Sequence, residues 1–173
     1  MPKIIENCRE KLLDEARRQI NECGYGALTM RGVASACGVG VGTVYNYFPS
    51  KDSLIATFML EDWQAATADM HKAFGSGSPS EILSAEYDGL VAFGKQHRAL
   101  FSDPAAIAAF SVLPRAWHKR LREQLAIPLE RALSGRGNAE FLSRFLVESL
   151  LTWTQAGVSK EELAAVWLPL LQA

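Results

Sequence analysis

The chain has 173 residues, 49% of them hydrophobic, which is enough to bury a core as one domain or as a small domain joined to a larger one. Its formal net charge is −1, so the average charge gives no sign of a nucleic-acid partner, and any DNA-binding surface has to be local. No stretch approaches the roughly 20 consecutive apolar residues of a membrane span, and no apolar run follows basic residues at the N-terminus. We therefore expect a cytoplasmic protein with neither an export signal nor a membrane anchor.

Helices are predicted along the whole chain, because apolar residues recur at intervals of three and four rather than two. The helices expected in this all-α protein span residues 3–23, 29–37, 41–47, 51–74, 80–97, 115–133, 139–155 and 161–171. Pro104 and Pro114 divide the segment after residue 97 into shorter pieces. Ser159 and Glu162 form a capping box at the start of the last helix.

Residues 29–51 have the anatomy of a helix-turn-helix, with two short helices on either side of a glycine-containing turn. Apolar residues of both helices lock the pair together, which leaves hydrogen-bonding and aromatic side chains on the outside. The outward residues of the second helix are Thr43, Tyr45, Asn46 and Tyr47. Such a surface suits the major groove of DNA, where phosphates and base edges need hydroxyls, amides and apolar contacts. No Asp or Glu, which would repel phosphates, stands between Cys23 and Lys51.

The same segment resembles the signature of TetR-type transcriptional regulators. The resemblance is carried by Leu28-Thr29-Met30-Arg31, Val33-Ala34, Gly38-Val39, Gly42-Thr43-Val44-Tyr45-Asn46-Tyr47-Phe48 and Ser50-Lys51-Asp52. It implies a three-helix DNA-binding domain with a helix-turn-helix over residues 1–50. A long helix would join this domain to a helical ligand-sensing and dimerisation domain over residues 51–173.

By this resemblance, the DNA contacts fall on both short helices and on the start of the next one. The residues expected to bind DNA are Thr29, Arg31, Gly42, Thr43, Tyr45, Asn46, Tyr47 and Lys51. Thr29, at a helix N-terminus, would bind a phosphate, and so would Tyr47 and Lys51. Gly42 would let the recognition helix approach closely, and Thr43 would contact a base or a phosphate. Tyr45 and Asn46 would lie nearest the bases, with Asn46 setting specificity.

The last two helices are apolar around much of their surface, more than packing within one subunit requires. We expect an isologous homodimer through this hairpin, with an ordinary monomer core as the alternative. The expected dimer interface consists of Phe141, Phe145, Leu146, Leu150, Trp153, Leu163, Val166, Trp167 and Leu170.

The middle of the chain is rich in aromatic residues, which line a ligand cavity in some helical bundles and fill the core in others. The candidate pocket residues are Trp63, Tyr87, Phe93, His97, Phe101, Phe110 and Trp117. This composition favours an apolar or aromatic small-molecule effector, with Gln96, His97 or Tyr87 as polar anchors. We expect the effector to favour a state in which the two recognition helices are wrongly spaced for successive major grooves.

Neither a metal site nor a cofactor is expected, because the three histidines are not spaced like the ligands of a metal ion. The spacing of Cys8, Cys23 and Cys37 fits neither a disulfide framework nor a zinc finger. We therefore expect the three cysteines to be buried as small hydrophobic residues, with a redox-sensing thiol as the alternative.

The function that these patterns favour is a sequence-specific DNA-binding regulator, a repressor that a small molecule releases from a palindromic operator. No catalytic residues are expected, since no nucleophile elbow, phosphate loop or paired metal motif is present. Two interpretations compete with this function. One is a helical hairpin in which Tyr45, Tyr47 and Phe48 are core aromatics. The other is a helical ligand-binding or interaction protein that no longer binds DNA. Two features favour it: the nearly neutral net charge, and a glycine at position 40, where the family often has serine.

Overall fold

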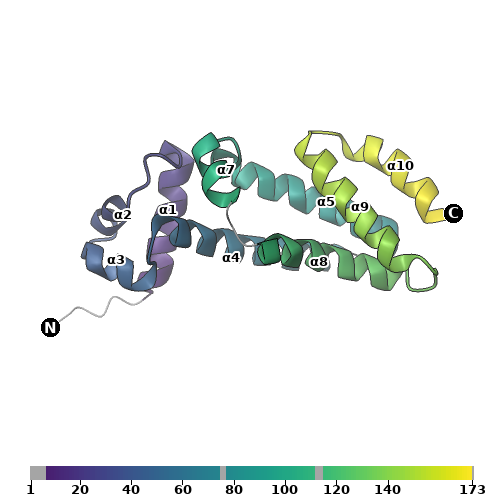
Figure 1. Cartoon of the computed structure of the whole chain (residues 1–173), viewed down its shortest axis with the longest axis horizontal. Helices are drawn as coiled ribbons and strands as arrows, with labels where there is room; N and C mark the ends of the chain where they lie inside the picture. Colours follow the sequence, from purple (N-terminus) through teal and green to yellow (C-terminus); the bar gives the residue numbers. More distant parts are fainter. Residues whose placement is uncertain (1–6, 75–76, 112–114, 173) are drawn as a thin grey trace. The chain divides into compact units, whose positions relative to one another are not determined.

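The computed structural model describes residues 7–74, 77–111 and 115–172, and their side chains except those of residues 110, 111 and 115–118. Regular structure in these ranges is helical, with no strand, which confirms the all-α prediction (Figure 1). The helices are α1 (Cys8–Cys23), α2 (Met30–Ala36), α3 (Val41–Tyr47), α4 (Lys51–Lys72), α5 (Pro79–Gln96), α6 (Arg98–Phe101), α7 (Pro104–Ser111), α8 (Arg115–Ala132), α9 (Ala139–Gln155) and α10 (Lys160–Gln172). Among the helices described, none has the length and apolar character needed to cross a membrane.

The helix boundaries follow the turn and cap residues closely. Helices α6 and α7 are the short pieces expected after residue 97, and Pro104 begins α7, where its missing N–H is not needed. Helix α4 ends at Lys72, two residues before the predicted end. Residues 3–6 of the first predicted helix lie outside the described residues.

The chain divides into two compact units. The first unit contains α1, α2, α3, α4 up to Asp62, α6 and α7, and the second contains α4 from Trp63, α5, α8, α9 and α10. The domain boundary between residues 50 and 51, at the start of α4, stays a prediction. Because α4 is one continuous helix, no turn residue marks the change from one unit to the other.

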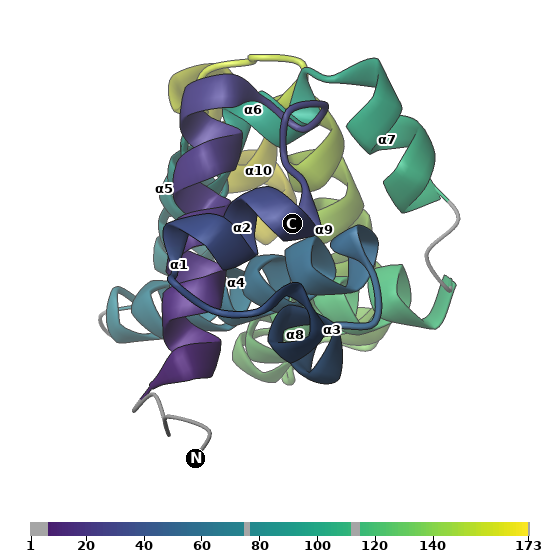
Figure 2. The same ribbon diagram turned by 90° about the vertical axis from the view of Figure 1, so that its left-hand side faces the viewer.

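The core of the first unit is built on one face of α1. Leu12, Leu13, Ala16 and Ile20 recur at helical spacing and are all buried. Figure 2 shows α1 in purple, with α2 and α3 following it. The residues that pack against this face come from the next three helices: Val33, Ala34, Val44, Phe48, Leu54, Ile55 and Phe58. This cluster fixes the helix-turn-helix on α1 and on the first half of α4.

Local hydrogen bonds set the ends of the short helices. The Thr29 hydroxyl accepts a hydrogen bond from the Gly32 amide at 3.0 Å and caps α2. Gly38 has a φ of +66°, the left-handed conformation that glycine adopts most easily, and thereby ends α2 and directs the chain into α3. Ser50 and Ser53 cap α4 reciprocally, each hydroxyl accepting from the other's amide.

The second unit is a helical bundle in which α8 and α9 form a hairpin and α5 packs against α8, α9 and α10. Its core is aliphatic, with Leu83, Leu125, Leu129, Leu146 and Leu150 fully buried. The predicted capping box at the start of α10 is present, with the Ser159 amide donating to the Glu162 carboxylate at 3.0 Å and the Glu162 amide donating to the Ser159 hydroxyl at 3.3 Å.

The three cysteines occupy different environments. Cys8 is buried and Cys37 is half-buried, as small hydrophobes would be. Cys23 is exposed at the end of α1, so the prediction of burial is wrong for this residue. Cys23 lies on the same face as Ala16 and Ile20, but it is the last residue of α1, where the buried core no longer covers this face.

Candidate DNA-binding face and effector site

Helix α3 has one buried face and one exposed face. Val44 is fully buried and Phe48, its C-cap, is 2% exposed, whereas Tyr45 is 50% exposed and Tyr47 is 47% exposed. Asn46 is exposed beside them. The interpretation of both tyrosines as core aromatics is therefore wrong, and only Phe48 belongs to the core. Large aromatic rings exposed next to an amide are suited to contact with another molecule.

The glycines of this region are not explained by packing inside the protein. A Cβ at Gly42 would meet no atom within 4 Å, and a Cβ at Gly40 would meet only the Thr43 hydroxyl, at 3.9 Å. Gly42 is exposed in the first turn of α3, so the space that its missing side chain leaves is open to a partner. Arg31 is also exposed, on α2, and supplies a cation near this face.

Lys51 is held at the start of α4 by Tyr25, the residue between the two glycines that follow α1. Its Nζ donates a hydrogen bond to the Tyr25 carbonyl oxygen and lies 3.8 Å from the centroid of the Tyr25 ring. The Tyr25 hydroxyl in turn donates to the Asp52 carboxylate at 2.9 Å. Partial burial lowers the pKa of the Lys51 ammonium and raises the pKa of the Tyr25 hydroxyl. The sequence analysis missed Tyr25, because its contact with Lys51 spans 26 residues.

A charged network ties α1 to α4 and α6 within the first unit. Arg17 donates to both carboxylate oxygens of Asp62, at 2.7 and 3.2 Å, and Arg9 donates to Glu61 at 2.6 Å. His97, just before α6, is buried with its Nε2 3.3 Å from the Asp62 carboxylate. Burial lowers the pKa of this imidazole, so it is neutral at neutral pH. The network holds α1, against which α2 and α3 pack, in contact with α4.

The predicted pocket residues do not form one described cavity. His97 lies in the first unit between the rings of Phe58 and Phe101, with centroids at 6.2 and 6.4 Å. In the second unit, Trp63 packs edge-on against Phe93 at 5.3 Å. Tyr87, also in the second unit, donates its hydroxyl to the Val158 carbonyl at 3.0 Å. The side chains of residues 110 and 117 lie outside the described residues, so the predicted roles of Phe110 and Trp117 stay predictions.

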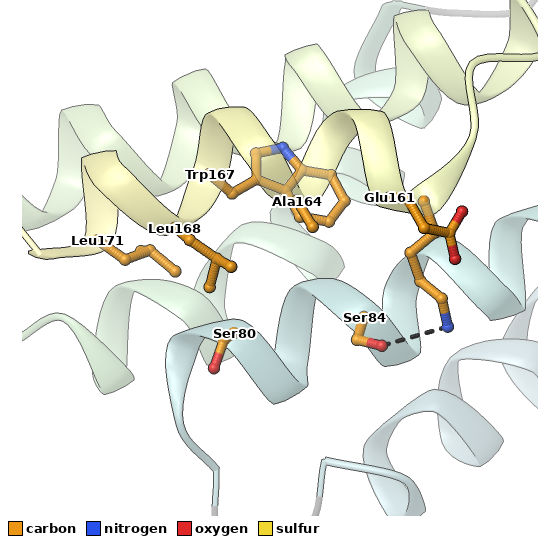
Figure 3. A pocket seen from close by; sticks show the side chains of 8 residues that line it. Ser80, Ser84, Glu161, Ala164, Trp167, Leu168 and Leu171 are labelled. Carbon is orange, nitrogen blue, oxygen red and sulfur yellow. Dashed lines mark hydrogen bonds between the residues drawn. The ribbon is translucent and has the colours of Figure 1, made fainter.

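A shallow pocket of about 250 Å³ lies instead between α5 and α10, as Figure 3 shows. Its lining residues are Ser80, Ser84, Lys160, Glu161, Ala164, Trp167, Leu168 and Leu171. The Lys160 ammonium at one end is already paired with Asp88 at 2.7 Å. The sequence analysis did not identify this pocket, because its walls come from two helices about 80 residues apart in the chain.

Glu86 is the buried residue of the second unit that sequence reasoning overlooked. It is fully buried in α5, and neither of its carboxylate oxygens has a hydrogen-bond partner among the described residues. Burial raises the pKa of this carboxyl well above its ordinary value. A signal was present in the sequence, since an acidic residue interrupts the apolar face that Ile82, Leu83 and Phe93 form.

The predicted dimer residues divide into a buried and an exposed group. Leu146, Leu150, Leu163 and Trp167 are buried within the chain itself. Large apolar side chains of the same two helices are exposed: Phe141, Phe145, Trp153 and Val166, with Phe141 72% exposed. Leu170 is half-buried. Phe141 and Phe145 stack at 6.3 Å and form a continuous apolar surface on α9.

Residues 12–57 match the family described as bacterial regulatory proteins, tetR family. The transcriptional repressor Rv1474c of Mycobacterium tuberculosis is 31% identical over 137 residues, which cover 76% of this chain and 70% of that protein. Other relatives match over only 31% to 48% of their own length.

Solved structures share the fold along most of the chain. Salmonella enterica GusR superposes with a TM-score of 0.68 at 19% identity, over 99% of this chain and 100% of that one. RolR in complex with resorcinol superposes with a TM-score of 0.61 at 19% identity, over 96% of this chain and 87% of that one.

Proposed function

Since the chain belongs to the TetR family of bacterial regulatory proteins and is a helix-turn-helix transcriptional regulator, we propose that it is a repressor that binds a palindromic operator as a homodimer and leaves it when a small molecule binds. The observation that carries this proposal is the outer face of α3, where Tyr45, Asn46 and Tyr47 are exposed. The family consists of transcriptional regulators, which are not enzymes.

The DNA contacts follow from the chemistry of this face. Asn46 and Tyr45 project where a recognition helix meets base edges, and an amide can form the paired hydrogen bonds that identify adenine. Tyr47 and Lys51 contact phosphates, and so does Thr29 at the N-terminus of α2. Gly42 allows the backbone of α3 to approach the groove, which its open surroundings support. The site of action is the cytoplasm, where bacterial operators are accessible.

The homodimer forms through α9 and α10. The exposed side chains of Phe141, Phe145, Trp153 and Val166 support this assignment, because a patch of this kind is unusual on a monomer. A two-fold axis through the patch would present two recognition helices, which explains a palindromic operator whose half-sites lie about 34–36 Å apart.

The second unit receives the effector, an apolar or aromatic molecule. Binding favours a state in which the two copies of α3 no longer match successive major grooves. Helix α4 carries the change, because it is continuous from Lys51 in the first unit to Lys72 in the second. RolR, whose fold is similar, is known with resorcinol bound, and this supports a small aromatic effector.

Selection of binding sites from random duplexes tests this function. The purified protein is expected to enrich a palindrome, and a promoter that carries it is expected to be silenced in a transcription assay with purified polymerase. Tyr47→Ala should weaken binding to the enriched site. Ile107→Ala, which removes a similarly exposed apolar side chain from α7, is the control and should leave binding unchanged. A folded dimer that enriches no site at low salt would contradict the proposal and favour a ligand-binding or interaction protein.

A further inference from the structure

Three side chains described in the second unit have buried polar atoms without a hydrogen-bond partner: Glu86, Thr154 and Trp167, of which only Glu86 is ionisable. Four polar or charged residues are buried in the described part of the chain: Thr67, Glu86, His97 and Ser143. The Thr67 hydroxyl donates to the Trp63 carbonyl, the Ser143 hydroxyl donates to the Glu140 carbonyl, and His97 faces Asp62. Glu86 alone among these four has two carboxyl oxygens without a partner.

An unpartnered carboxyl in the middle of a helix destabilises the fold. It has lost its hydration and receives no hydrogen bond in return, whereas an apolar side chain of similar size would gain from burial. Glu86 lies two turns inside α5, so it caps no helix end, and it forms no hydrogen bond or ion pair with another described residue. Desolvation raises its pKa well above the ordinary value, and no neighbouring charge is among the causes. A sensor domain gives such a carboxyl a use, because a ligand can complete its hydrogen bonds.

The surroundings of Glu86 can adapt to a ligand. Glu86, Gly89 and Phe93 share one face of α5, at the spacing of successive helical turns. A Cβ at position 89 would overlap with the Met70 side chain, so the Met70 thioether occupies the space beside Gly89. Methionine is flexible and fills irregular gaps, which means that it can leave this space at a modest cost.

Aromatic surface lies on the same face. The ring of Trp63 meets Phe93 edge-on, and the Trp63 indole donates to Gln124 of α8 at 2.7 Å. This hydrogen bond fixes the orientation of Trp63, whose ring is buried in the same unit. Two contacts within one unit thus join this face of α5 to α4, those of Met70 with Gly89 and of Trp63 with Phe93.

We propose that the effector is an arylalkylamine, whose ammonium group binds the carboxylate of Glu86 in a site that opens when the Met70 side chain moves away from Gly89. The inference rests on the proposed function, since it names the class of the effector. In the complex, the carboxylate of Glu86 accepts hydrogen bonds from the ammonium group. An anion beside this carboxyl would be buried without a countercharge, and a hydrocarbon would leave the carboxyl unpartnered.

The test uses three probes of one shape and different charge: phenethylamine, phenylpropionate and phenethyl alcohol. Isothermal calorimetry and thermal unfolding of the full-length protein should detect binding of the amine at millimolar concentration and no binding of the anion. Glu86→Gln, which keeps the shape and cannot ionise, should weaken the amine at least about tenfold, as expected for one charge-assisted hydrogen bond. The same variant should change the affinity for the alcohol little.

Two further variants make the outcome clear. Met70→Ala empties the space beside Gly89 and should bind phenethylamine more tightly than the wild-type protein. Glu86→Leu should fold, because it removes the unsatisfied group, and should not bind the amine. Absence of amine binding to the wild-type protein, or equal binding to Glu86→Gln, would overturn the inference. Affinity for the selected operator, measured without probe on the same preparations, separates this failure from a failure of the proposed function.

Discussion

Replacement of Lys51 by alanine should reduce the salt dependence of DNA binding. Each phosphate that a cation neutralises contributes about 0.9 to the slope of the logarithm of affinity against the logarithm of salt concentration. A homodimer has two copies of Lys51, so the slope should become shallower by about 1.8. Between 50 and 200 mM salt, the variant should therefore lose about 12-fold less affinity than the wild-type protein.

The structure explains why Lys51 can act as a fixed phosphate ligand. Its ammonium is held by the carbonyl oxygen and the ring of Tyr25, which limits the side-chain freedom lost on binding DNA. The same contacts stabilise the first unit, so the substitution should also destabilise the fold by about 1 kcal/mol. Binding has to be measured well below the melting temperature of the variant.

Fluorescence anisotropy of a labelled operator, titrated across a salt series, gives the slope for each variant. Lys95→Ala is the matched control, because Lys95 is exposed in the last turn of α5 and its loss changes the net charge equally. The control should retain the wild-type slope. An unchanged slope for Lys51→Ala, or the same change in both variants, would refute the assignment of Lys51 to a phosphate.

Three further predictions concern stability and assembly. Glu86→Leu should raise the free energy of unfolding by about 1–3 kcal/mol. Because the pKa of Glu86 is raised in the folded state, the wild-type protein loses stability as pH rises above the ordinary carboxyl pKa, and the gain from the substitution should grow with pH in urea titrations. A gain that does not depend on pH would contradict the burial argument. Phe145→Asp should yield monomers in analytical ultracentrifugation and weaken operator binding, whereas persistence of dimers would place the interface elsewhere. Asp62→Ala should cost about 2 kcal/mol in thermal unfolding, because it leaves Arg17 and His97 without their shared carboxylate, and a neutral effect would show that the network is dispensable.

The helix-turn-helix was predictable from sequence because its signals are local. A cap at Thr29, a glycine turn and the alternation of buried Val44 with exposed Tyr45 lie within a few turns of helix. Local hydrogen bonds and helical periodicity determine such features, so they can be identified in a linear sequence. The same reasoning predicted the capping box at the start of α10.

The remaining features depend on packing between distant segments. Tyr25 holds Lys51 and Trp63 binds Gln124 because segments far apart in sequence lie side by side. The predicted apolar stripes of α9 and α10 likewise could not be divided into core and surface from periodicity, because both groups recur at helical spacing. Glu86 was the exception, since a carboxylate within an apolar stripe is visible in the sequence.

The central claim is that the outer face of α3 recognises a specific DNA sequence. The most direct test is the ratio of Kd for a scrambled duplex to Kd for the selected palindrome, measured at physiological salt. We expect a ratio of at least about 10³ for the wild-type protein. Asn46→Ala should lower it by a factor that corresponds to about 1–3 kcal/mol and relax one position of each half-site. A ratio near one for the folded wild-type dimer would contradict the account.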